Sequence, residues 1–191
     1  MHNLISTFIT EKFTTDEHTG TFQASTMFID ISGFTVMTRQ LMSQGKEGGE
    51  VLNDILNSIF EPVIDAVYDN GGDITSFEGD AFTAIFRNPV SRKPGKVLAF
   101  NDPGLKSAQE ILNLIEKLGH QETKFGMFDL SVKIGLSHGE VEWSIVGSDE
   151  HKTWYFRGEA IDSAAQAEKG CGKNQISVAG NRKFPSDKDV D

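Results

Sequence analysis

Hydrophobic positions along this chain follow two periods in turn, one typical of strands and one typical of helices. Short apolar or alternating runs predict strands at residues 22–31, 74–77, 81–86, 130–136, 140–146, 153–156 and 175–178. Apolar residues spaced three and four positions apart predict helices at residues 34–42, 51–67, 105–118 and 160–169. The alternation of the two kinds of element predicts one mixed sheet with helices on its faces.

The two ends of the chain do not share this pattern. Residues 1–21 are polar except for apolar residues at helical spacing, so we expect a short docking helix in an N-terminal appendage. The tail, residues 181–191, is rich in Lys and Asp and is expected to fray. Between them, residues 22–180 are expected to form a single domain, which suits a chain of 191 residues.

Composition narrows the classes of function. The net charge of −10 would repel the phosphates of a nucleic acid, so no nucleic-acid partner is expected. No apolar run approaches the roughly 20 residues that cross a bilayer, and the N-terminus carries no secretion signal, so we expect no membrane span and a cytoplasmic protein. Cys171 is the single cysteine, which excludes an internal disulfide and agrees with a reducing compartment.

Two acids stand where apolar strands end or turn. Asp30 lies at the carboxyl end of the first predicted strand, and Asp80 lies in the turn Glu78-Gly79-Asp80 between two later strands. A lone carboxylate among so many Phe and Ile residues is costly to desolvate, so the pair indicates a shared divalent metal. Taken singly, Asp30 could also be a helix N-cap and Asp80 an ordinary hairpin acid.

Other polar and aromatic residues near strand ends carry no such pattern. Asp73 is expected to be a solvated residue at the start of a strand. His138 and Trp143 lack the spacing of metal ligands, so we expect them to pack in the core or on the surface.

Four motifs, in order along the chain, together resemble one family. They are residues 27–38 (MFIDISGFTVMT), 71–86, 132–139 and 158–162. In this order and spacing they resemble the class III nucleotidyl cyclases, which convert a nucleoside triphosphate to a 3',5'-cyclic nucleotide and pyrophosphate. The resemblance covers about residues 22–180 and is greatest to the first catalytic half of bicarbonate-responsive soluble adenylyl cyclases.

The resemblance implies a fold, a cofactor and a set of partners. The fold is an α+β, ferredoxin-like cyclase sandwich with a mixed, mostly antiparallel sheet flanked by helices. Two Mg²⁺ or Mn²⁺ ions are expected, held by Asp30, Asp80 and the carbonyl of Ile31. The catalytic sites are expected between the subunits of a homodimer, or of a heterodimer with a complementary cyclase domain.

The triphosphate is expected to meet backbone amides and cations. The amides of Ser32, Gly33, Phe34 and Thr35 open a helix and are predicted to cradle phosphate oxygens. Cations expected to neutralise the triphosphate come from a basic loop and the residue before it: Arg87, Arg92 and Lys93. A solvated basic loop without contact to substrate is the alternative.

The positions at which purine cyclases read the base depart from the family. Ser76 stands where the family carries Lys or Glu, and Tyr155 where it carries Asp, Thr or Cys. ATP is the first expectation, a pyrimidine triphosphate is the alternative, and plain strand packing also accounts for Tyr155. Ser76 and Ala165 replace the Lys and Arg of the bicarbonate pocket, which argues against bicarbonate control.

The positions expected to steady the transition state depart as well. The family has an Asn and an Arg that reach across the dimer interface, and this chain has Asp162 and Gln166. A carboxylate about 5 Å from a triphosphate costs about 3 kcal/mol per charge pair at an effective dielectric of about 20, and losing a positioned cation costs about 10²- to 10³-fold in rate. Three hypotheses remain: an active cyclase, a metal-donating half that needs a complementary chain, and a nucleotide-binding sensor.

Overall fold

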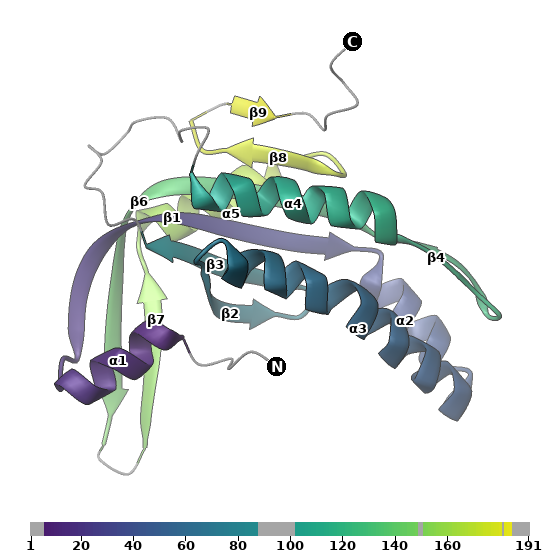
Figure 1. The fold of residues 1–191 in the computed structure, drawn as a ribbon, viewed down its shortest axis with the longest axis horizontal. Helices are drawn as coiled ribbons and strands as arrows, with labels where there is room; N and C mark the ends of the chain where they lie inside the picture. Colours follow the sequence, from purple (N-terminus) through teal and green to yellow (C-terminus); the bar gives the residue numbers. More distant parts are fainter. Residues whose placement is uncertain (1–5, 88–101, 149–150, 181, 185–191) are drawn as a thin grey trace.

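The computed structural model describes residues 6–87, 102–148, 151–180 and 182–184, and shows a sheet covered by helices on both faces (Figure 1). Its seven strands run in the order β2-β3-β1-β6-β8-β9, and β7 pairs with β6. The strands are β1 (Thr19–Ser32), β2 (Asp73–Glu78), β3 (Ala81–Arg87), β6 (Ser131–Gly147), β7 (Lys152–Arg157), β8 (Gln175–Val178) and β9 (Arg182–Phe184). All described pairs are antiparallel except β6 with β8, which confirms the predicted mixed, mostly antiparallel sheet.

The helices follow the predicted order. They are α1 (Thr7–Thr15), α2 (Phe34–Met42), α3 (Gly45–Asp69), α4 (Pro103–Leu118) and α5 (Glu159–Lys169). Helices α3 and α4 bury their apolar stripes against Met27, Ile29 and Ile31 of β1, all fully buried in the main core. The intervening residues of β1 point to the other face, where the Thr26 hydroxyl donates to the Ala160 carbonyl of α5 at 2.7 Å. Asp30 shares this second face with Thr26.

The longest strand corrects a prediction. We expected two strands at residues 130–136 and 140–146, but β6 runs without a break and pairs with β1 from Thr19 opposite Ser144 to Ser32 opposite Ser131. A glycine inside this strand serves helix packing. A Cβ at Gly135 would meet the Ala164 carbonyl of α5 at 2.0 Å, so glycine lets the helix approach the strand.

Helix α1 confirms the predicted docking helix and shows where it docks. Phe8 and Ile9 are buried in a cluster with Trp143, and the Phe8 and Trp143 rings meet edge to face at 5.0 Å. Trp143 therefore packs, as predicted. The prediction that Asp73 is solvated was wrong: it is 6% exposed, because α1 covers it and Thr7 donates to its carboxylate.

Three further elements differ from expectation. A separate hairpin, β4 (His120–Thr123) with β5 (Gly126–Asp129), was not predicted. Strand β1 begins inside the expected appendage, and residues 182–184 of the tail expected to fray form β9, which pairs with β8. In the part of the chain that the structure describes, no helix combines the length and the apolar character that crossing a membrane requires.

Candidate active site

The structure brings Asp30 and Asp80 together at one end of the sheet. Asp30 lies opposite Ala81, the residue that follows Asp80, in the pairing of β1 with β3. The Ile31 amide donates to the Asp80 carbonyl at 3.3 Å, which ties the turn to the end of β1. Gly79, with φ of 74°, gives the turn the left-handed residue it needs. Two acids 50 positions apart thus converge because a hairpin returns the chain to the end of β1.

Each carboxylate is held by one hydroxyl and keeps other oxygens for a ligand. The Thr35 hydroxyl donates to Asp80 Oδ2 at 3.0 Å, and the Ser32 hydroxyl donates to Asp30 Oδ2 at 3.3 Å. The described residues contain no group of three or more His, Cys, Asp or Glu side chains that could enclose a metal by themselves. Two carboxylates and a nearby carbonyl suit Mg²⁺, which keeps water and phosphate oxygens for its remaining positions. The donor set therefore fits a divalent ion that arrives with a triphosphate.

The turn between β1 and α2 brings the backbone at Gly33 close to the Asp129 carbonyl. Gly33 has φ of 97° and is the N-cap of α2, where no side chain caps the helix. A Cβ at this position would meet the Asp129 carbonyl at 2.6 Å. The backbone amides in the first turn of α2 therefore have no side-chain acceptor from the N-cap residue. They lie beside both acids, and the N-terminus of a helix favours the binding of an anion.

A cation that sequence reasoning missed stands beside the acid pair. Lys133 of β6 lies directly opposite Asp30 of β1, so the two side chains share one face of the sheet. Its Nζ also lies 3.8 Å from Oε1 of Glu168 on α5. A lysine inside the otherwise apolar run Val132-Lys133-Ile134 was the available signal, because strand periodicity places it on the same face as Asp30 once the register is known.

Glu168, Lys133 and Asp30 form a charged row beside the acid pair. Glu168 is only 7% exposed, and this burial raises the pKa of its carboxyl, with Lys133 acting to lower the pKa and Asp30 to raise it. Lys133 thus lies between two carboxylates, one of which is held in a largely apolar setting.

Of the predicted phosphate cations, Arg87 is far from the acids. It ends β3, whereas Asp80 precedes the start of that strand, and strand rise separates Arg87 from Ala81 by about 20 Å. Its guanidinium lies 4.6 Å from the centroid of the Phe8 ring on α1. Strand β3 thus places Arg87 at the opposite end from its own chain's acid pair, and its contact with a triphosphate stays a prediction. Arg92 and Lys93 lie outside the described residues.

The remaining predicted residues are exposed and spread over the surface. Ser76 is exposed on β2, close to the turn that holds Asp80. Tyr155 is 38% exposed on β7 and pairs with Ser144, which lies eleven residues from Lys133, or about 36 Å measured along strand β6. Within one chain, Tyr155 cannot meet a base bound near the acid pair.

Asp162 and Gln166 lie one turn apart on α5, and both are exposed. Gln166 borders a hollow of about 590 Å³ between α5 and β8, which small residues line: Ser163, Gly170, Ser177 and Gly180. Both side chains are therefore accessible to a second chain.

Comparison with known proteins agrees with this arrangement. The family model described as the adenylate and guanylate cyclase catalytic domain matches residues 17–183. The chain is 35% identical over 162 residues to adenylate cyclase type 10 of Homo sapiens and 33% identical to that of Oryctolagus cuniculus, in each case over 84% of this chain and 10% of the relative. It thus spans about a tenth of the length of these relatives.

Solved structures share the fold. The adenylyl cyclase CyaB from P. aeruginosa superposes with a TM-score of 0.61 at 21% identity, covering 84% of this chain and 78% of that one. The guanylyl cyclase Cya2 superposes with a TM-score of 0.62 at 24% identity, covering 86% and 82%. The expected cyclase sandwich is confirmed, and the match over residues 17–183 shows that this chain belongs to the adenylate and guanylate cyclase catalytic domain family.

Proposed function

We propose that this chain is the metal-donating domain of a nucleotidyl cyclase that converts a nucleoside triphosphate, ATP in the first instance, to a 3',5'-cyclic nucleotide and pyrophosphate. The observation that carries the proposal is the convergence of Asp30 and Asp80 beside the open N-terminus of α2. These groups supply the metal and phosphate contacts of one half of a site. We place the reaction at an interface with a second cyclase domain, in the cytoplasm.

In this proposal the chain's own residues bind and orient the triphosphate. Asp30, Asp80 and the Ile31 carbonyl hold two Mg²⁺ or Mn²⁺ ions, which when bound favour ionisation of the 3'-hydroxyl and offset charge on the leaving pyrophosphate. The backbone amides of residues 32–35 donate hydrogen bonds to the phosphate oxygens, and the ammonium of Lys133, on β6, offsets the negative charge of the phosphates. The 3'-oxygen attacks the α-phosphorus, the bond to the β-phosphate bridging oxygen breaks, and the 3'-hydroxyl proton passes to water.

The other half of the site is the reason to propose a complementary partner. In a symmetric homodimer, Asp162 and Gln166 of one chain would face the triphosphate held by the other. At about 5 Å an added carboxylate costs about 3 kcal/mol per charge pair at an effective dielectric of about 20. A partner with an amide and a cation at these positions would remove that cost, so we expect a heterodimer to be the faster enzyme.

The base is the least constrained part of the proposal. Ser76 is small and exposed near the acid pair, whereas the Tyr155 ring is carried by the far strand β7 and could reach a base only from a second chain. A pyrimidine base is the alternative to adenine, because a pyrimidine is smaller and would leave room in the site for the Tyr155 ring of a second chain.

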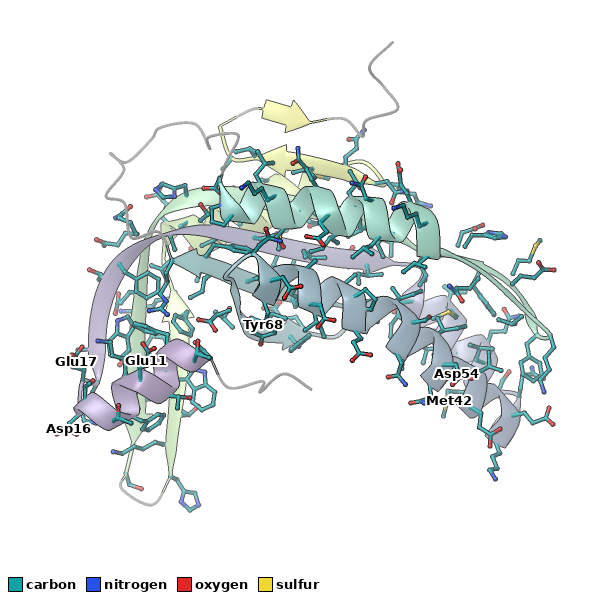
Figure 2. All side chains as sticks on the ribbon, viewed as in Figure 1. Glu11, Asp16, Glu17, Met42, Asp54 and Tyr68 are labelled. Carbon is teal, nitrogen blue, oxygen red and sulfur yellow. The ribbon has the colours of Figure 1, made fainter. Side chains whose placement is uncertain are left out.

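One assay tests the proposal directly. The chain is incubated with Mn²⁺ and each of the four ribonucleoside triphosphates, alone and mixed with a cyclase domain that carries the Asn and Arg, and cyclic products are detected by mass. We expect cyclic AMP in the mixture, and its loss in Asp30→Asn and Asp80→Asn. Asp54→Asn, an exposed acid of α3 labelled in Figure 2, is the matched control.

The outcomes separate the candidates. Equal product with and without the partner would show a self-sufficient homodimer and overturn the heterodimer. Binding of Mn²⁺ and triphosphate without product in either setting would indicate a nucleotide-binding sensor. Absence of both binding and product would refute the proposed site.

A further inference from the structure

Helix α1 contacts both strands of the hairpin that carries Asp80. Asp73 opens β2, and its Oδ1 accepts hydrogen bonds from the Thr7 amide at 3.4 Å and the Thr7 hydroxyl at 3.2 Å. A carboxylate that is 6% exposed needs such donors. The donors come from the first residue of α1, where the helix dipole favours a negative charge, and the side chain of the N-cap Ser6 makes no capping bond of its own. Asp73 thus caps α1 from another element.

The next residue of α1 contacts the other strand of the hairpin. The Arg87 guanidinium at the end of β3 lies over the Phe8 ring, which is itself fixed by edge contacts to Phe22 at 5.2 Å and Trp143 at 5.0 Å. Asp73 pairs with Ile85, so the start of β2 and the end of β3 lie at the same end of the hairpin. Consecutive residues of one helix therefore hold both strands at that end.

At its opposite end the hairpin carries the metal acid next to the pairing of β3 with β1, in which Ala81 lies opposite Asp30. The turn is joined to β1 and α2 through the Asp80 carbonyl and carboxylate, which accept from the Ile31 amide and the Thr35 hydroxyl. Among the described strands, β2 is the outermost on its side of the sheet and pairs with β3 alone, and its register shifts between Ile74 and Ser76. An edge strand with an irregular register depends on contacts outside the sheet for its position.

Tyr68 shows how closely the start of β2 is enclosed. It ends α3 on the side of β2, where Figure 2 labels it. Burial, and then the charge of Asp73, raise the pKa of the Tyr68 phenol, which places the phenol in the field of that carboxylate. Glu11 of α1, and Asp16 and Glu17 just after the helix, are exposed and take no part in this contact (Figure 2).

We infer that Thr7 and Asp73 are positioning residues for Asp80, and that α1 acts as a clamp on the hairpin carrying that acid. Helix α1 precedes residue 17, where the family match begins, whereas Asp73 lies within the match. The inference rests on the proposed role of Asp80 as a metal ligand. Release of α1 frees the start of β2, and the displacement reaches the turn along a strand of six residues.

The test measures metal binding without turnover. Mn²⁺ is titrated into the full chain in the presence of 3'-deoxy-ATP, which lacks the attacking hydroxyl, and free Mn²⁺ is followed by electron paramagnetic resonance. Thr7→Val and Asp73→Asn are expected to weaken Mn²⁺ binding by about threefold to tenfold, which is less than the loss typical of one hydrogen bond to a charged group because the effect reaches Asp80 only through β2. Thr7→Ser keeps the hydroxyl and is expected to bind as the unchanged chain does.

A matched control and a second measurement separate positioning from general destabilisation. Thr14→Val removes a hydroxyl that bonds within α1, to the Glu11 carbonyl at 2.6 Å, and is expected to leave Mn²⁺ binding unchanged. Amide hydrogen exchange is expected to quicken in β2 of Thr7→Val while that of α4 stays slow, and to stay unchanged in β2 of Thr14→Val; faster exchange throughout the chain would indicate general destabilisation instead.

The results distinguish this inference from the proposed function. Should Asp80→Asn abolish Mn²⁺ binding while Thr7→Val and Asp73→Asn bind normally, the clamp is overturned and the metal site stands. Should the unchanged chain and Asp80→Asn bind Mn²⁺ equally well, the clamp and the proposed metal site are both overturned. Weakened binding in Thr7→Val, restored in Thr7→Ser, supports the clamp.

Discussion

Substitution of Gly33 tests the shape of the phosphate loop. Gly33→Ala adds a Cβ to a residue with φ of 97°, and that atom would lie 2.6 Å from the Asp129 carbonyl. The left-handed conformation costs a non-glycine residue about 1–2 kcal/mol, and the steric overlap adds about 1–3 kcal/mol. We expect Gly33→Ala to lower the free energy of unfolding by about 2–5 kcal/mol in total.

Two other glycines of the same corner serve as controls. Gly45 at the start of α3 has φ of 68° but nothing within 4 Å of an added Cβ, so Gly45→Ala isolates the backbone cost of about 1–2 kcal/mol. Gly49 lies inside α3 with open space around it, so Gly49→Ala is expected to stabilise the helix by about 0.5–1 kcal/mol. The three variants thus separate strain, overlap and helix propensity.

Urea unfolding followed by circular dichroism measures all three variants. Binding of Mn²⁺ with 3'-deoxy-ATP is measured in parallel, at urea concentrations where each variant is folded. Gly33→Ala is expected to weaken this binding, because relief of the overlap moves the amides of the α2 N-terminus. The reasoning fails if Gly33→Ala costs no more stability than Gly45→Ala, because the contact with Asp129 would then impose nothing.

Two further predictions concern the charged row beside the acid pair. Lys133→Met keeps the apolar stem but removes the cation, and is expected to weaken triphosphate binding by about tenfold, measured by calorimetry with Mn²⁺ present; unchanged affinity would exclude Lys133 from the phosphate contacts. The raised pKa of Glu168 means that the folded chain binds more protons than the unfolded chain between 4.5 and the raised value, so stability falls as pH rises through that window. Glu168→Gln is expected to remove this fall in urea titrations at several pH values, and an identical slope in both proteins would contradict the assignment.

Much of the fold could be predicted because local patterns and the final contacts agree. The apolar run before Asp30 and the stripe on α3 both face the main core, so the period of each stretch predicted its partner. The turn at Gly79 and Asp80 followed from turn chemistry alone. At these places the local sequence and the tertiary structure demand the same conformation.

The failures lie where a residue's role depends on a distant element. Residues 137–139 were expected to separate two strands, yet β6 runs through them because it pairs with β1 from Ser131 to Ser144. Asp73 has the character of a solvated acid, yet α1 covers it from 66 residues away. No local pattern encodes these contacts, since each depends on how separate elements pack.

The positions of the charges explain why the acid pair was the most predictable part of the site and the partner-facing residues the least. Asp30 and Asp80 are brought together by one hairpin and one strand pairing within the chain, so strand ends and a turn suffice to anticipate them. Asp162 and Gln166 are exposed on α5, and Tyr155 lies on a strand about 36 Å along the sheet from Lys133. Such residues can act on a triphosphate only through a second chain, so their chemistry is defined by a surface that this sequence does not contain. Under the proposed function, the carboxylate of Asp162 and the uncharged side chain of Gln166 on α5 favour pairing with an unlike second domain that supplies an amide and a cation.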